Sequence, residues 1–285
     1  MSNVAGLQCR DRVLDLGAPV VMGVLNVTPD SFSDGGRFST PGSALSHARQ
    51  MIEEGAAIID VGGESTRPGA APATLEEELT RVVPVIEALR KQSGIFISVD
   101  TSKPEVMRAA TAAGADIIND VCALTMPGAL SAAHETRAGV CLMHMKGEPR
   151  TMQLAPHYDD AVAEVSAWLA ARVAACREAG IDAARLAVDP GFGFGKRVVD
   201  NLALLKHLSQ FQKLGVTLAV GLSRKSMLAT LTGRKVGDRT AGSVALAAIA
   251  VLNGARIVRA HDVAATVDAI RVADAVSQGE EFDGT

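Results

Sequence analysis

Residues 185–196 read Arg185-Leu-Ala-Val-Asp-Pro-Gly-Phe-Gly-Phe-Gly-Lys196, and the plan of this stretch recurs along the chain. A short apolar run predicts a buried β-strand that ends at a carboxylate, Asp189. The loop that follows alternates glycine with Phe192 and Phe194. Glycine lets the backbone approach a ligand closely or adopt a positive φ, and phenylalanine supplies an apolar wall. A strand that delivers an acid into such a loop is typical of the floor of a binding site.

Eight short apolar runs of this kind alternate with helical segments. Strands that alternate with helices indicate a parallel sheet, and eight such units in 285 residues predict a closed (β/α)8 TIM barrel of class α/β. An open, doubly wound sheet is the alternative, but it normally has fewer strands and a single crevice. The expected strands cover residues 20–25, 57–61, 95–99, 116–118, 139–143, 185–189, 216–221 and 256–258.

The chain is expected to form one domain. Residues 19–276 make up the barrel, residues 1–18 form an N-terminal segment with a small hairpin over 7–16, and residues 277–285 form a flexible tail. Helices are expected over 41–54, over 74–91 with a kink at Pro84, from Lys103-Pro104 onward, over 159–179 and over 263–276.

Composition places the chain among soluble globular proteins. Charged residues make up 21% and apolar residues 48%, and a net charge of -4 without a basic run argues against a nucleic-acid partner. The four cysteines form no CxxC pair, which favours free buried thiols in a reducing compartment. The N-terminus lacks a signal-peptide core, and the longest apolar stretch, 243–252, is too short to span a membrane. We therefore expect a cytoplasmic protein.

The helix that contains residues 243–252 is apolar nearly all round. Such a helix is covered by more than its own barrel. A subunit interface explains this pattern, and so does deep burial within one chain.

Polar side chains stand at nearly every expected strand end. In a TIM barrel these ends surround the active site. A single Asp or Asn there is more often a turn or helix-capping residue, but capping does not account for the whole set. The set comprises Asn26, Asp60, Asp100, Asn119, His144, Asp189, Lys225, Arg259 and His261.

Two segments suggest what the site binds. The glycine run lacks the spacing of a phosphate-binding P-loop, so the spacing alone is weak evidence. One of Phe192 and Phe194 is readily explained as core, and the other as a ligand wall. The segment Ser223-Arg224-Lys225-Ser226 stands at a strand-to-helix junction and favours an anion, as do Arg259 and His261 on the eighth strand.

With these motifs in hand, the chain resembles the dihydropteroate synthases, a pterin-binding TIM-barrel family of the folate pathway that sulfonamides inhibit. The matching motifs span nearly the whole barrel in family order. They are Gly23-Val-Leu-Asn-Val-Thr-Pro-Asp-Ser-Phe-Ser-Asp-Gly35, Asp60-Val-Gly-Gly-Glu-Ser-Thr-Arg-Pro-Gly69, Ser98-Val-Asp-Thr101, Asn119-Asp120, residues 189–195, Gly221-Leu-Ser-Arg-Lys-Ser226 and Arg259-Ala-His-Asp262. Ala260, where a β-branched residue is expected, is the one departure noticed.

The resemblance implies a reaction. Such an enzyme transfers an alkyl (pterinylmethyl) group by joining 6-hydroxymethyl-7,8-dihydropterin diphosphate to 4-aminobenzoate, which gives 7,8-dihydropteroate and pyrophosphate. A buried carboxylate suits the adjacent N–H donors of the pterin, and an amide suits its mixed edge. The implied pterin site comprises Asp100, Asn119, Met143, Asp189, Lys225 and Arg259.

The resemblance also implies the other subsites. The diphosphate would contact Asn26, Arg67, Arg259 and His261, with Mg²⁺ on its oxygens and Asn26 as the protein ligand to the metal. The catalytic residues would be Asp100, Lys225, Arg259 and His261, and the loops 28–36 and 62–69 would close over the diphosphate. The 4-aminobenzoate pocket would be formed by Phe32, Thr66, Pro68, Phe194, Lys225 and Ser226.

Two other functions stay open at this point. A pterin-binding methyltransferase shares the barrel and the pterin carboxylate, but it needs no anion site. A catalytically inactive relative that binds pterin is the third reading. The expected partners are the two small substrates and a second copy of the chain, without nucleic acid or membrane.

Overall fold

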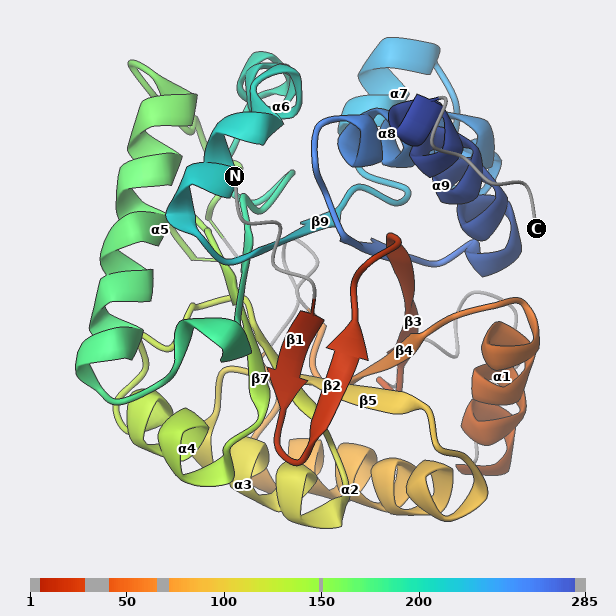
Figure 1. Cartoon of the computed structure of the whole chain (residues 1–285), viewed down its shortest axis with the longest axis vertical. Helices are drawn as coiled ribbons and strands as arrows, with labels where there is room; N and C mark the ends of the chain where they lie inside the picture. Colours follow the sequence, from red (N-terminus) through yellow and green to blue (C-terminus); the bar gives the residue numbers. More distant parts are fainter. Residues whose placement is uncertain (1–5, 29–40, 66–71, 149–150, 280–285) are drawn as a thin grey trace.

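The computed structural model describes residues 6–28, 41–65, 72–148 and 151–279. Eight parallel strands close into a barrel in the order β10-β3-β4-β5-β6-β7-β8-β9, with helices around it (Figure 1). The predicted (β/α)8 barrel is therefore confirmed. The barrel strands are β3 (Val20–Asn26), β4 (Ile58–Gly62), β5 (Phe96–Asp100), β6 (Ile117–Asp120), β7 (Gly139–Met143), β8 (Leu186–Asp189), β9 (Thr217–Gly221) and β10 (Ile257–Ala260).

The helices follow the strands in the expected alternation. The predicted kink at Pro84 stays a prediction, and the last helix continues to Gln278, so residues 277 and 278 belong to it rather than to a tail. The α-helices are α1 (Pro41–Glu53), α2 (Leu75–Gln92), α3 (Pro104–Ala113), α4 (Ala129–Thr136), α5 (Ala161–Glu178), α6 (Val198–Lys206), α7 (Met227–Thr232), α8 (Thr240–Leu252) and α9 (Val263–Gln278). Short 3-10 turns occupy Ala183–Arg185, Leu208–Leu214 and Val236–Asp238.

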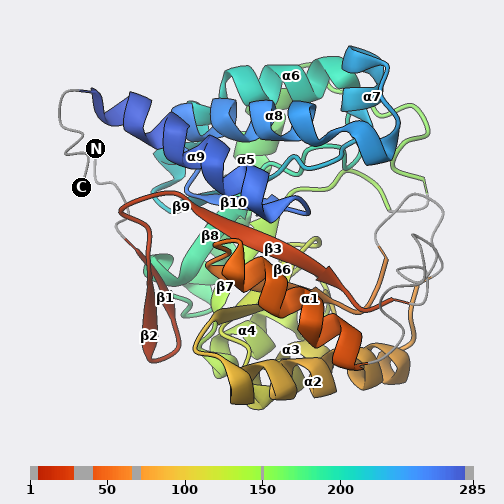
Figure 2. The same cartoon turned by 90° about the vertical axis from the view of Figure 1, so that its right-hand side faces the viewer.

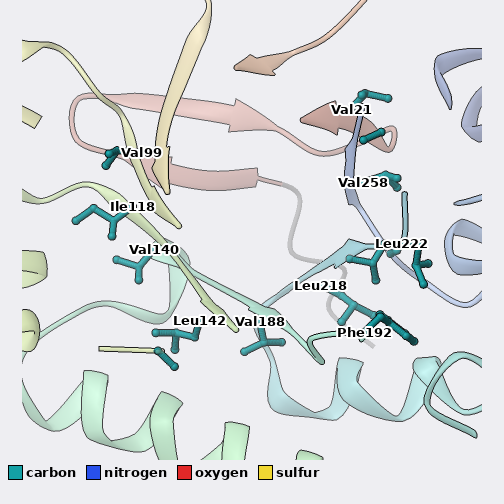
Figure 3. Packing of buried hydrophobic residues seen from close by; sticks show 14 of the residues in the cluster. Val21, Val99, Ile118, Val140, Leu142, Val188, Phe192, Leu218, Leu222 and Val258 are labelled. Carbon is teal, nitrogen blue, oxygen red and sulfur yellow. The ribbon is translucent and has the colours of Figure 1, made fainter. Parts of the chain in front are cut away.

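Side-chain alternation divides the strand residues between two layers of core. Side chains at successive strand positions point to opposite faces. Figure 3 shows part of the outer layer, in which Val21, Val140, Val188 and Val258 pack with residues of the helices. The inner layer fills the barrel near the beginnings of the strands. It comprises Met22, Ile58, Ile117, Cys141, Ala187, Ala219 and Ile257.

A hairpin covers the end of the barrel where the strands begin (Figure 2). Strands β1 (Gly6–Cys9) and β2 (Arg12–Asp15) pair antiparallel, as predicted for residues 7–16. Leu7 and Leu14 are buried with the inner layer, and the Cys9 thiol lies 2.8 Å from where a Cβ at Gly139 would sit. The hairpin therefore closes the barrel at this end, and the opposite end carries the polar residues.

The four cysteines are free thiols. Cys9, Cys141 and Cys176 are buried as expected, but Cys122 is only half-buried. None of the helices in the described ranges is long and apolar enough to cross a membrane.

Candidate active site

The polar cluster of the barrel lies two residues beyond the inner core layer. Two residues further along a strand, a side chain points to the same face, so each inner residue is followed by another that points into the barrel. Ile58 leads to Asp60, Ile117 to Asn119, Ala187 to Asp189 and Ile257 to Arg259. The same step leads from Cys141 to Met143 and from Ser98 to Asp100. Strand periodicity thus brings six residues from distant parts of the sequence together at the end of the barrel where the strands end, which we call the mouth.

Arg259 joins the two acids on its side of the mouth. Its Nε donates to Asp60 Oδ2 at 2.6 Å, and its Nη2 donates to Asp100 Oδ2 at 2.8 Å. Desolvation lowers the pKa of Arg259, but the negative charges of Asp60 and Asp100 outweigh it and raise the pKa overall. Arg259 is therefore a permanent cation held by two carboxylates.

Asp60 is fully buried beneath this pair. Its Oδ2 also accepts a hydrogen bond from Asn119 Nδ2 at 3.2 Å, and its Oδ1 has no hydrogen-bond partner among the described residues. Asp60 thereby orients both the Asn119 amide and the Arg259 guanidinium. The sequence motif contained Asp60 but gave it no role; its signal was a charged residue inside an otherwise apolar strand, Ile58-Ile-Asp-Val61.

Asp100 stands at the exposed edge of the same cluster. Burial raises the pKa of Asp100 to about 7, because desolvation outweighs the attraction of Arg259 and is reinforced by the negative charge of Asp60. Arg259 is the neighbour that favours the carboxylate form of Asp100.

Asp189 forms the floor on the opposite side. It is 7% exposed, and its Oδ1 accepts a hydrogen bond from the Gly191 N–H at 2.7 Å. Its Oδ2 lies 3.6 Å from where a Cβ at Gly221 would sit, so the absence of a side chain there keeps space beside the carboxylate. Met143 lies next to Asp189 in the register of β7 and β8. The pair offers one acceptor and one apolar surface to a flat ligand.

Lys225 and Phe194 define the rim. The Lys225 ammonium lies 4.2 Å from the centre of the Phe194 ring, in a cation–π contact. Desolvation lowers the pKa of Lys225 to about 8, and the attraction of Asp189 partly opposes this. Phe192 is fully buried and belongs to the outer core layer, as Figure 3 shows. Phe192 is thus the core member of the phenylalanine pair, and Phe194 is the one at the mouth.

The segment that carries Lys225 is held at Arg224, which adopts a left-handed backbone conformation with φ of 57°. The Arg224 N–H donates to Ser243 Oγ at 3.0 Å, and its carbonyl accepts from Arg239 Nη1 at 3.0 Å. Its guanidinium forms an ion pair with Asp262 at 2.7 Å. These contacts fix the residue before Lys225 at its backbone and at its side chain.

His261 faces the same segment. Its backbone N–H donates to Ser223 Oγ at 3.2 Å, and its Nδ1 lies 3.0 Å from the same oxygen. Because Ser223 Oγ accepts the backbone proton, its own hydroxyl proton is available to Nδ1, which leaves the ring proton on Nε2. Desolvation and the charges of Arg259 and Arg224 lower the pKa of His261 to about 3. His261 is therefore a neutral donor in the substrate-free protein.

Asn26 is the predicted ligand of Mg²⁺. Its Oδ1 and Asp100 Oδ2 lie 3.6 and 3.7 Å from where a Cβ at Gly62 would sit, so both oxygens border one small space. Amide and carboxylate oxygens are the donors that Mg²⁺ accepts. Within the described residues no group of three His, Cys, Asp or Glu side chains could hold a metal. An amide oxygen and a carboxylate oxygen that border one space are donors of the kind that suits Mg²⁺.

The glycine-rich loop encloses a buried lysine. Lys196 is 3% exposed, and its Nζ lies 2.9 Å from His144 Nδ1 and 2.8 Å from the Gly191 carbonyl oxygen. Desolvation lowers the pKa of Lys196 to about 7 and that of His144 to about 3. His144 also packs against Trp168, with ring centres 5.0 Å apart. His144 is thus a strand-end residue that supports the loop from behind.

The structure brings together most of the residues predicted for the site, but not all of them are within its described ranges. Ser226 directly precedes α7 and is exposed. Phe32, Thr66, Arg67 and Pro68 lie outside the described residues, as do residues 29–36 and 66–69 of the two loops.

Comparison with known proteins identifies the family. The sequence model described as pterin binding enzyme matches residues 22–261. The chain belongs to this family. Among pterin binding enzymes it is similar to the dihydropteroate synthase of Escherichia coli strain K12, with 54% identity over 268 residues that cover 94% of this chain and 95% of the relative.

Solved structures of pterin binding enzymes agree with this result. The Yersinia pestis dihydropteroate synthase in complex with a sulfonamide drug matches with a TM-score of 0.93 and 48% identity, over 96% of this chain and all of that one. The Xanthomonas albilineans dihydropteroate synthase with 4-aminobenzoic acid matches with a TM-score of 0.90 and 54% identity, over 96% and 99% of the two chains.

Proposed function

We propose that this pterin binding enzyme is a dihydropteroate synthase. It condenses 6-hydroxymethyl-7,8-dihydropterin diphosphate with 4-aminobenzoate to give 7,8-dihydropteroate and pyrophosphate. The observation that carries the proposal is the mouth of the barrel, where the buried acid Asp189 faces the cations Lys225 and Arg259 in a chain 54% identical to a dihydropteroate synthase. An acid for the heterocycle and cations for a leaving anion are the two requirements of this reaction.

Recognition of the pterin would rest on Asp189 and Asn119. Both are 7% exposed, so a ligand that binds them gives up its contact with water and needs hydrogen bonds in return. The Asp189 carboxylate accepts from the adjacent amino and ring N–H groups of the pterin, and Lys225 donates to its carbonyl and ring nitrogen. Met143 packs against the ring.

Departure of the diphosphate would be assisted by Arg259 and His261. The bond between the pterin methylene carbon and the diphosphate oxygen breaks, and the electron pair leaves with the diphosphate. Arg259 neutralises this charge while it also lies over the ring face, and His261 donates from Nε2. The ring delocalises the cation that remains, and Asp100 stabilises it electrostatically.

Mg²⁺ would be held by Asn26, with the diphosphate and water supplying its other ligands. When bound, the ion neutralises part of the charge of the leaving group. Asp100 Oδ2 borders the same space as Asn26 Oδ1, which supports a role for this carboxylate beside the metal.

Attack by 4-aminobenzoate completes the reaction. The amine lone pair forms the new C–N bond, and the surplus proton is released to solvent, so no dedicated base is required. Phe194 and Lys225 would line the pocket of the aromatic ring, with the carboxylate toward Ser226 and the start of α7. The predicted contributions of Phe32, Thr66 and Pro68 to this pocket, and of Arg67 to the diphosphate site, are retained as part of the proposal.

Pyrophosphate release tests this function. The purified chain is mixed with the pterin diphosphate, 4-aminobenzoate and Mg²⁺, and we expect pyrophosphate only when both substrates are present. A pterin-binding methyltransferase would release none, and neither would an inactive relative. A methyltransferase would also not need the ordered cation segment at Arg224 and Lys225.

We further propose that the chain forms a homodimer through α8 and α9. Because α8 is apolar nearly all round, one chain alone leaves some of its apolar side chains exposed: Ile249 is 43% and Leu252 is 50% exposed. On the neighbouring α9, Val272 and Val276 are each 66% exposed. A second copy would cover these side chains. Light scattering should give twice the mass of one chain, and Ile249→Asp with Val272→Asp should give a monomer. The cytoplasmic location stays a prediction, consistent with the four free thiols.

A further inference from the structure

Lys196 has a complete set of internal contacts but no place in the reaction. Its Nζ donates to the carbonyl oxygens of Gly191 at 2.8 Å, Phe194 at 3.1 Å and His144 at 3.3 Å, and it lies 2.9 Å from His144 Nδ1. At 3% exposure it is more deeply buried than Asp189. A buried ammonium costs free energy unless it is well hydrogen-bonded, so these contacts explain how it is tolerated, but not what it serves.

The loop that Lys196 holds would otherwise have unusual freedom. Gly191, Gly193 and Gly195 all have positive φ, at 70°, 81° and 62°. A segment with a glycine at every second position has many alternative conformations. Two side chains hold the loop in a single conformation. Lys196 donates to its carbonyl oxygens, and Asn201 Oδ1 accepts from the Gly193 N–H at 2.8 Å.

Phe194 links this internal contact to the mouth. Its carbonyl accepts from Lys196, and its ring lies beneath the Lys225 ammonium at 4.2 Å. The backbone end of Phe194 is thus fixed by one lysine and the ring end contacts another.

We infer that Lys196 is a positioning residue for 4-aminobenzoate, which acts by holding Phe194 in place against Lys225. This inference rests on the proposed function, because it takes Phe194 and Lys225 as the walls of the 4-aminobenzoate pocket. Lys196 itself does not touch the substrate. Its effect is to keep the aromatic wall preformed, so that binding does not have to order the loop.

The test compares Lys196→Met with the wild type in steady-state kinetics. Methionine has a similar length and no donor, so it removes the contacts to Gly191 and Phe194 without a large change in volume. Loss of the hydrogen bonds to Gly191 and Phe194 should raise the KM for 4-aminobenzoate about tenfold or more. The KM for the pterin diphosphate should change by less than about threefold. Lys206→Met, the same substitution on the exposed side of α6, is the matched control and should change neither value.

A double-mutant comparison identifies the route. If Lys196 acts through Phe194, the double variant of Lys196→Met and Phe194→Ala should have the same KM for 4-aminobenzoate as Phe194→Ala alone. Multiplication of the two single effects would overturn the inference, and so would an equal rise in the KM of both substrates.

Folding is measured separately, by thermal unfolding of each variant. A merely structural role would lower the melting temperature and the active fraction but leave both KM values unchanged, and that result would also overturn the inference. If Lys196→Met does not fold, Lys196→Gln replaces it, because the amide keeps the buried site polar while its shorter chain withdraws the donor from the Phe194 carbonyl; a raised KM for 4-aminobenzoate supports the inference and an unchanged one overturns it. Pyrophosphate release by the wild type tests the proposed function independently of every variant.

Discussion

Arg259 on β10 and Asp60 on β4 are joined by a 2.6 Å hydrogen bond across 199 residues of sequence. The bond holds the guanidinium at the mouth of the barrel, where its Nη2 also reaches Asp100. Two carboxylates hold the guanidinium, so in the proposed function an anionic substrate would meet a cation that is already oriented. Preorganised charge of this kind costs no rearrangement when the leaving group departs.

For Arg259→Ala we expect a larger loss of affinity for the pterin diphosphate than for the free 6-hydroxymethyl pterin. The diphosphate loses a charge-assisted partner, roughly 1.5–3 kcal/mol, whereas the ring loses only a surface to stack on. Calorimetry with both ligands measures the difference. Equal losses would remove Arg259 from the anion subsite.

Asp60→Asn should destabilise the fold by about 1–3 kcal/mol, because the charge-assisted hydrogen bond to Arg259 is weakened while Asp100 still holds the guanidinium. It should also lower the pKa of Asp100, since the negative charge of Asp60 contributes to raising that pKa. Denaturant unfolding and an NMR titration of Asp100 measure the two effects. The control is Asp268→Asn on the exposed side of α9, which should change neither.

Asp189→Asn should weaken pterin binding about 10- to 100-fold, since an amide N–H would then face the N–H donors of the pterin. Thermal stability should change little, because the asparagine oxygen can still accept from Gly191. Unchanged affinity by calorimetry would contradict the assignment of Asp189 to the pterin.

The kcat/KM for 4-aminobenzoate should fall as the pH rises through about 8. Desolvation lowers the pKa of Lys225 to about 8, so its ammonium is fully charged below that pH and is lost above it. A pH–rate profile measures this alkaline fall in kcat/KM, the alkaline limb of the profile. In Lys225→Arg the limb should move to higher pH; a limb that stays in place would belong to another group, such as Lys196.

Gly191→Ala and Gly215→Ala form a matched pair for backbone strain. Both glycines have positive φ, at 70° and 68°, so alanine is strained at either position by about 1–2 kcal/mol. A Cβ at Gly191 would also lie 1.8 Å from the His144 carbonyl oxygen, whereas at Gly215 nothing lies within 4 Å. Gly191→Ala should therefore cost roughly 2 kcal/mol more in denaturant unfolding. Similar costs would show that the loop can shift away from His144.

The sequence predicted the barrel and most of the mouth because both follow from local patterns. Apolar runs mark the strands, and a polar residue such as Asn119 or Asp189 just after a run marks the strand end. Period-two alternation then determines which side chains point inward. The N-terminal hairpin predicted over residues 7–16 was also confirmed.

Pairings between distant residues could not be predicted by such patterns. Neither Asp60 nor Arg259 carries any local sign of the other, since their contact depends on closure of the barrel. His144 was grouped with the mouth because it follows a strand, yet it contacts Lys196 and Trp168. The acceptors of Lys196 are backbone carbonyls, which sequence does not distinguish.

The hairpin at the closed end of the barrel has a consequence for substrate entry and product release. Since Leu7 and Leu14 are buried at that end, we expect both substrates and both products to pass through the opposite end. If the pterin binds between Asn119 and Asp189, as proposed, it should bind before 4-aminobenzoate, and dihydropteroate should leave after pyrophosphate. Closure of one end of the barrel therefore predicts an ordered sequence of substrate binding and product release.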